Sequence, residues 1–174
     1  YYKWYKEELY DNYQNNEETM PDSSIQALLK GELFAFLRAI FSRSLFTITV
    51  GEQGLHLKKK SWRGADIAIF KRENFILDNK FAKLPPEIIV EINIKGYYET
   101  QEQAFKYFER KNNQLFAFGV KKIIWVFTES KSVQVVTPQG SQDFDWDEDV
   151  EVMEGVRFNV QALIDGYFQA GKED

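Results

Sequence analysis

The chain has 174 residues, 44% of them hydrophobic and 28% charged, which is enough for one globular domain with its own core. It has no cysteine and a single histidine, His56, which excludes disulfides and cysteine nucleophiles and argues against a multi-histidine metal site. The net charge of −5 argues against a protein that coats nucleic acid through bulk charge, and no run of 18 apolar residues predicts a membrane span.

The first 40 residues predict two helices. Aromatic and apolar residues recur at helical spacing near the start, so residues 1–22 are predicted as an N-terminal helical arm. Pro21–Ser24 then has the capping side chains of a helix start, and apolar residues over 25–40 follow the spacing of a helix that faces a core. Glu32 lies within this helix, and a solvated glutamate is the simplest interpretation of it.

The next segment predicts a hairpin and then a strand with one acid. Residues 45–50 alternate as a strand, 51–54 contain turn residues, and 55–59 are predicted as the antiparallel partner. A further strand is predicted over 65–70, and Asp66 near its start is its one acidic residue.

Basic residues crowd the segment from 58 to 72, where six Lys and Arg stand against a single Asp, whereas the chain after 140 is acidic. A basic patch of this kind can meet phosphate groups. A solvated hairpin face explains the same pattern equally well.

An apolar run followed by alternating polar residues sets apart the segment after Pro85 and Pro86. Ile88–Val90 is apolar without alternation, which is typical of a strand buried on both faces. Glu91, Asn93 and Lys95 then share one face, because side chains alternate along a strand. Such groups at the end of a buried strand are costly unless they are paired or bind something. The segment is therefore a candidate site, with a Glu91–Lys95 salt bridge as the alternative.

A helix is predicted over 99–118, ended by Gly119, and a second buried strand over 120–127. A strand, a crossover helix and a strand form a βαβ-like unit, so the two strands are predicted to be parallel. The remaining predicted elements are a return strand over 132–137, an acidic loop around Trp146, a strand within 150–158 and a helix over 159–170.

Carboxylates and lysines occur in an order that suits phosphodiester hydrolysis. Glu32 lies on a helix, Asp66 starts one strand and Glu91 lies on the next. Two carboxylates on adjacent strands can hold Mg²⁺, which prefers oxygen ligands. A nearby lysine, Lys95 or Lys111, can orient or activate a water, while the metal stabilises the charge that grows on the phosphate.

These segments together resemble the Uma-type family of proposed restriction endonucleases, within the PD-(D/E)xK nuclease superfamily. The resemblance covers roughly residues 23–170. Its matching segments are Ala65–Ile69, Pro85–Ile92, Lys111, Phe118–Val126, Gly155–Phe158 and Leu163–Ile164.

The resemblance implies an α/β (α+β) fold, a restriction-endonuclease-like mixed β-sheet flanked by helices, as one domain over 1–174. It also implies Mg²⁺- or Mn²⁺-dependent hydrolysis of DNA in the cytoplasm, which suits a chain without cysteine. Homodimers are common in the superfamily, so a homodimer is one possible assembly. By position, Asp66, Glu91 and the peptide carbonyl of Ile92 would be metal ligands. Lys111 would be the catalytic lysine moved to the helix, and Glu32 a supporting acid.

One departure from the superfamily pattern is Asn93, which stands where a lysine is expected and cannot supply a positive charge. Lys95 lies on the same face, two residues and about 6.6 Å further along the strand than Asn93. Lys111 fits the family pattern better. Two alternatives therefore stay open. Beside an active endonuclease, these are an inactive nuclease-fold module that binds nucleic acid or protein, and a structural domain whose acids form buried ion pairs.

Overall fold

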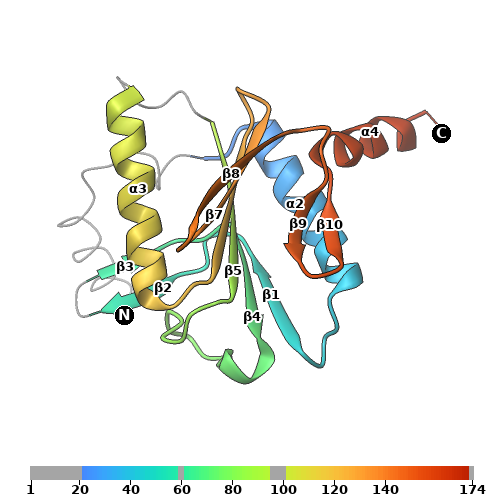
Figure 1. Cartoon of the computed structure of the whole chain (residues 1–174). Helices are drawn as coiled ribbons and strands as arrows, with labels where there is room; N and C mark the ends of the chain where they lie inside the picture. Colours follow the sequence, from blue (N-terminus) through green and yellow to red (C-terminus); the bar gives the residue numbers. More distant parts are fainter. Residues whose placement is uncertain (1–20, 59–60, 95–100, 173–174) are drawn as a thin grey trace.

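The computed structural model describes residues 21–58, 61–94 and 101–172. Its centre is a six-stranded mixed sheet in the order β1-β4-β5-β6-β7-β8 (Figure 1). These strands are β1 (Phe46–Val50), β4 (Ile67–Lys71), β5 (Ile88–Asn93), β6 (Lys122–Phe127), β7 (Ser132–Thr137) and β8 (Gly140–Asp145). Within this sheet β5 and β6 are parallel and the other neighbours antiparallel. The predicted mixed sheet is therefore confirmed, as is the parallel pair around the crossover helix.

Shorter elements complete the described fold. Two small hairpins lie outside the main sheet, and the helices are three α-helices and one short 3-10 turn among the described residues. Their bounds are α2 (Ser24–Ile40), β2 (Leu55–Lys58), β3 (Ser61–Arg63), η2 (Arg72–Asn74), α3 (Gln101–Phe118), β9 (Val150–Met153), β10 (Val156–Phe158) and α4 (Val160–Ala170). The predicted N-terminal arm lies outside the described residues.

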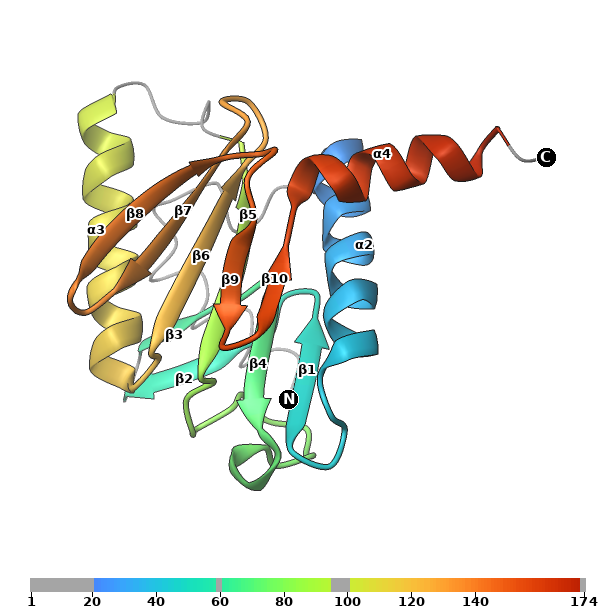
Figure 2. The same cartoon turned by 45° about the vertical axis from the view of Figure 1, so that its right-hand side comes forward.

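The sheet has a hydrophobic layer on each face. Helices α2 and α4 and the β9–β10 hairpin cover one face, and α3 covers the other (Figures 1 and 2). Strand β5 serves both layers, because Ile88, Val90 and Ile92 belong to the α2 layer and Ile89 to the α3 layer. This burial on both sides explains why the first half of the strand is apolar without alternation.

Helix α2 begins at a capping box. The Ser23 hydroxyl accepts from the Gln26 backbone N–H, and the Gln26 side chain accepts from the Ser23 backbone N–H. Leu29, Leu33 and Leu37 recur every four residues and are buried, so one stripe of the helix packs on the sheet. The capping residues thereby hold the start of α2 beside the end of β5.

Gly119 ends α3 and directs the chain into β6. Its φ of +121° favours glycine, and a Cβ at this position would lie 2.8 Å from Pro85 Cγ. The turn after α3 therefore packs closely on the segment that leads into β5.

The predicted pairing of the first two strands is wrong. Residues 45–50 do not form a hairpin with 55–59, because β1 pairs with β4 and β2 pairs with β3. The Gly51–Gly54 segment bends the chain but does not reverse its direction as a hairpin turn would. The N–H groups of Gly51 and Gln53 donate to the carbonyls of Asp66 and Ala65, so the chain stays paired through the bend.

The region after β7 also differs from the prediction. The segment predicted as an acidic loop contains the exposed edge strand β8, and only then reaches buried Trp146. The predicted last strand is a hairpin, β9–β10, which turns at Gly155 with a φ of +78°.

Candidate metal centre

Asp66 and Glu91 meet at the ends of neighbouring strands. Strands β4 and β5 pair Ile67 with Val90, so the same register continued by one position sets Asp66 opposite Glu91. Both fall on the α3 face by alternation, and both are buried, with 7% of each residue exposed. The two predicted carboxylates are therefore brought together at one place.

The Asp66 carboxylate is held by two contacts from opposite directions. Its Oδ2 accepts a 2.8 Å hydrogen bond from the Ile92 backbone N–H, and its Oδ1 lies 2.8 Å from Lys30 Nζ. Ile92 lies beyond the β4 ladder, so the Asp66 side chain satisfies a backbone group that β4 does not reach. Both oxygens of Asp66 are engaged.

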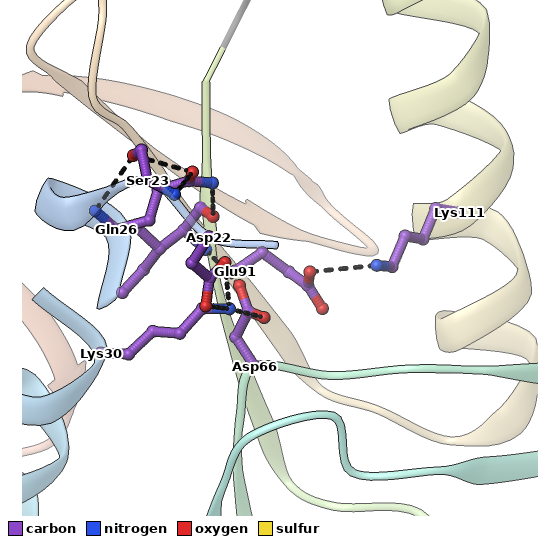
Figure 3. Close-up of polar contacts among 8 residues, drawn as sticks. Asp22, Ser23, Gln26, Lys30, Asp66, Glu91 and Lys111 are labelled. Carbon is purple, nitrogen blue, oxygen red and sulfur yellow. Dashed lines mark hydrogen bonds and ion pairs between the residues drawn. The ribbon is translucent and has the colours of Figure 1, made fainter. Parts of the chain in front are cut away.

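The start of helix α2 and the segment just before it bring three polar side chains to this end of the sheet. Gln26 and Lys30 are spaced by four residues and lie on one side of α2, and Asp22 directly precedes the capping residue Ser23. Gln26 Nε2 donates to the Ile92 carbonyl at 3.1 Å, and Lys30 Nζ lies 2.8 and 2.7 Å from the two Asp22 carboxylate oxygens. Figure 3 shows Lys30 reaching Asp66 from the side opposite to Lys111.

Glu91 pairs with the lysine of α3. Lys111 Nζ donates to Glu91 Oε2 at 3.0 Å, and the two side chains are 4% and 9% exposed. The ammonium also lies 5.5 Å from the Trp125 ring centroid, within the range of a cation–π contact. The second oxygen, Glu91 Oε1, is buried without a hydrogen-bond partner among the described residues.

These environments shift two pKa values. Burial raises the pKa of the Glu91 carboxyl to about 8 against the opposing charge of Lys111, and the negative charge of Asp66 adds to the rise. Burial lowers the pKa of Lys30, but its hydrogen bonds to Asp22 and Asp66 outweigh burial and leave that pKa above its ordinary value. A fixed cation near Glu91 Oε1 would favour the ionised carboxylate.

The donor set suits a hard divalent cation. Asp66, Glu91 and the Ile92 carbonyl supply oxygen atoms only, and Mg²⁺ completes such sets with water. Glu91 Oε1 is a buried acceptor in need of a donor or a cation. In the described part of the chain, no group of three or more Asp, Glu, His or Cys side chains is arranged so that it could hold a metal ion. The site therefore depends on two carboxylates and a carbonyl.

Glu32 is a predicted site residue that the structure places outside this cluster. Glu32 is half-buried on α2, two residues and hence about 200° around the helix from Lys30. No hydrogen bond or ion pair joins it to these carboxylates within the described ranges, so the structure does not bring it into the cluster. Lys95 lies outside the described residues. Asn93 ends β5 on the same face as Glu91, and its carbonyl accepts from the Thr128 backbone N–H.

Sequence reasoning missed Asp22, Gln26 and Lys30. These three residues are spaced by four positions and lie next to the buried leucine stripe of α2. This pattern could have identified them as candidate site residues. Lys30 in particular was assigned no role, although 8% exposure is low for a lysine.

The described members of the basic segment do not form one patch. Arg63 on β3 donates to Gln114 of α3, whereas Lys71 and Arg72 lie at the end of β4 away from Asp66. Arg72 there donates to the Arg43 carbonyl. Arg63 is thus separated from Lys71 and Arg72 by the length of β4.

The comparison with solved structures finds a similar fold. A crystal structure from Anabaena variabilis, described as "a putative nuclease belonging to DUF820", matches with a TM-score of 0.65 and 15% sequence identity, covering 84% of this chain and 83% of that one. At this identity the likeness shows the fold, which confirms the predicted fold class. No protein-family model and no curated protein sequence matches the chain. None of the described helices is long and apolar enough to cross a membrane.

Proposed function

We propose that this chain is a metal-dependent nuclease that hydrolyses phosphodiester bonds in DNA. The observation that carries the proposal is the convergence of Asp66, Glu91 and the Ile92 carbonyl at the end of β5, with Lys111 on one side. These are the residues and the order that the PD-(D/E)xK resemblance implies. The fold shared with a protein described as a nuclease supports the same interpretation.

Asp66, Glu91 and the Ile92 carbonyl would hold Mg²⁺ or Mn²⁺. When bound, the metal supplies a Lewis acid that polarises the phosphate and favours a nucleophilic water. Two carboxylates and one carbonyl leave coordination positions for water and for a phosphate oxygen.

The remaining residues position these groups. The Ile92 N–H fixes the orientation of the Asp66 carboxylate, and Lys111 engages Glu91 Oε2, which leaves Oε1 available. Lys111 is buried beside Trp125 and Leu115, so bulk water is excluded from this ion pair. Lys111 is thereby suited to keep Glu91 in place, which is the role that Asn93 cannot fill with its neutral amide.

The direct test is cleavage of supercoiled plasmid DNA with Mg²⁺ or Mn²⁺. We expect nicking by the wild-type protein, and a loss of about 10²-fold or more in Asp66→Asn and Glu91→Gln, because each loses a charged ligand. Glu102→Gln is a matched control, since Glu102 is an exposed carboxylate on α3 that pairs with Lys106. Equal rates in all four proteins would reject the proposal.

A second candidate is a nuclease-fold module without turnover that binds nucleic acid or protein. Two observations favour it: Asn93 replaces the superfamily lysine, and an ammonium already lies on Asp66. It predicts a mobility shift of DNA without any nicking in the presence of either metal. Metal-dependent nicking that Asp66→Asn abolishes would reject it.

A further inference from the structure

Lys30 contacts two carboxylates from different parts of the fold. Its Nζ lies 2.8 Å from Asp66 Oδ1 and 2.7 Å from the nearer oxygen of Asp22. Asp66 precedes a central strand, whereas Asp22 precedes the helix that carries Lys30 itself. The ammonium therefore bridges the helix and the sheet (Figure 3).

The Lys30 ammonium lies on an oxygen that a metal would need. Asp66 Oδ2 is engaged by the Ile92 N–H, so Oδ1 is the oxygen left for a cation, and Lys30 contacts it. An ammonium and a divalent ion on one carboxylate oxygen repel each other strongly in a site with little water. Lys30 and the metal are thus alternatives at Asp66 Oδ1.

Asp22 offers Lys30 a place to remain when Asp66 is released. Both Asp22 oxygens already lie within hydrogen-bond distance of Lys30 Nζ, and the Asp22 side chain is 34% exposed, against 9% for Asp66. A lysine that leaves Asp66 can therefore keep a carboxylate partner and gain water without any movement of α2. The exchange requires a change in side-chain torsion angles only.

We propose that Lys30 is an internal cation that occupies Asp66 until a divalent metal replaces it, and that Asp22 then retains the displaced ammonium. The inference rests on the proposed function, since it takes Asp66 as a metal ligand. It adds a control on metal loading: without metal, Lys30 neutralises Asp66 and keeps the helix start on the sheet. With metal, the same charge stays close by on Asp22.

The test is a calorimetric titration of the purified chain with MnCl₂ alone, without DNA. Lys30→Met removes the competing charge, and we expect it to bind Mn²⁺ about tenfold more tightly than wild type. Asp22→Asn removes the alternative partner, so Lys30 stays on Asp66 and Mn²⁺ binds about tenfold more weakly. Lys106→Met on the exposed part of α3 is the matched control and keeps wild-type affinity.

A thermal unfolding series gives a second readout that needs no activity. Mn²⁺ raises the midpoint of Lys30→Met more than that of wild type, because the metal then neutralises an otherwise unpaired Asp66. Asp22→Asn alters an exposed residue, so it tests the exchange even where Lys30→Met fails to fold.

The outcomes separate this inference from the proposed function. Equal Mn²⁺ affinity in wild type, Lys30→Met and Asp22→Asn overturns the exchange and leaves the metal site standing, as does weaker binding by Lys30→Met. Mn²⁺ binding by Lys30→Met alone shows that Lys30 blocks the site permanently, which overturns both the exchange and metal-dependent function in the wild-type chain. No Mn²⁺ binding by any variant overturns both.

Discussion

The two lysines that face the candidate site have different surroundings, although Lys111 lies 3.0 Å from Glu91 and Lys30 lies a similar 2.8 Å from Asp66. Lys111 pairs with Glu91 inside the α3 layer, where both side chains are almost fully buried and the Trp125 ring lies alongside. The Lys30–Asp66 pair is also buried, but Lys30 has a second carboxylate partner in Asp22, whose side chain is 34% exposed. The exchange inferred above therefore applies to Lys30 and Asp66.

This difference assigns separate roles to the two sides of the site. A buried ion pair is costly to break, because removing one partner leaves a charge that water cannot reach. A lysine that can move to a second, partly exposed carboxylate leaves its first partner at smaller cost. Under the proposed function, the α3 side would hold Glu91 in a fixed geometry, whereas the α2 side would control metal loading at Asp66.

The largest expected effect tests the enclosed pair directly. At pH 9, Lys111→Met leaves Glu91 buried without its cation, and we expect the free energy of unfolding to fall by about 3–5 kcal/mol. Lys30→Met leaves Asp66 with the Ile92 N–H, so a smaller loss of about 1–2 kcal/mol is expected. Urea denaturation of the two variants measures both values.

A double variant supplies the control for this contrast. Lys111→Met combined with Glu91→Gln removes the uncompensated charge and should recover most of the lost stability. Equal losses in the two single lysine variants would contradict the distinction between an enclosed and an exchangeable pair.

The next prediction concerns pH and Glu91. The pKa of Glu91 is about 8 in the folded chain and its ordinary value is 4.5, so the folded state binds more protons between these values. Its contribution to stability is complete below pH 4.5 and is lost as pH rises through about 8. Glu91→Gln should therefore reduce the fall in unfolding free energy between pH 5 and pH 8 by a few kcal/mol.

The exposed carboxylate Glu129 serves as the control for this pH dependence of the unfolding free energy. Glu129→Gln should retain the wild-type pH dependence, measured by urea denaturation at each pH. A Glu91→Gln variant with an unchanged slope would show that burial does not hold protons on this carboxyl.

The parts of the fold that the sequence predicted are those with local signals. The apolar run of β5, the helical spacing of α3 and the glycine that follows it are each readable within a few residues, and a crossover helix implies a parallel pair. Asp66 and Glu91 could therefore be assigned to adjacent strands from the residue pattern alone.

The parts that were missed depend on long-range contacts. The pairing of β1 with β4 is decided by the bend at Gly51, which resembles a turn in sequence. Strand β8 consists of Gly, Ser, Gln and Asp with one Phe, because an exposed edge strand needs few apolar residues. Its pairing with β7, and not its own composition, makes it a strand.

The site was predicted in part for the same reason. Carboxylates on strands and a lysine on a helix fit a known pattern, whereas Lys30 lies 36 positions before Asp66 and belongs to no such pattern. Only the packing of α2 against the end of β5 brings Lys30 and Gln26 there. A supporting group on the first helix was expected, but the structure brings a lysine and an amide to the carboxylates instead of Glu32.

The smallest predicted effect tests how α2 is fastened to β5. The Gln26 side-chain amide makes two hydrogen bonds. Its Oε1 accepts from the Ser23 backbone N–H, and its Nε2 donates to the Ile92 carbonyl. Gln26→Ala should cost about 1–2 kcal/mol, and Ser23→Ala about 1 kcal/mol through the cap alone. In thermal and urea unfolding, the double variant Ser23→Ala/Gln26→Ala should be less stable than Ser23→Ala, because it also loses the hydrogen bond from Gln26 to the Ile92 carbonyl. If the double variant matches Ser23→Ala, the bond to Ile92 contributes no stability, and the α2 side of the site rests on Lys30 alone.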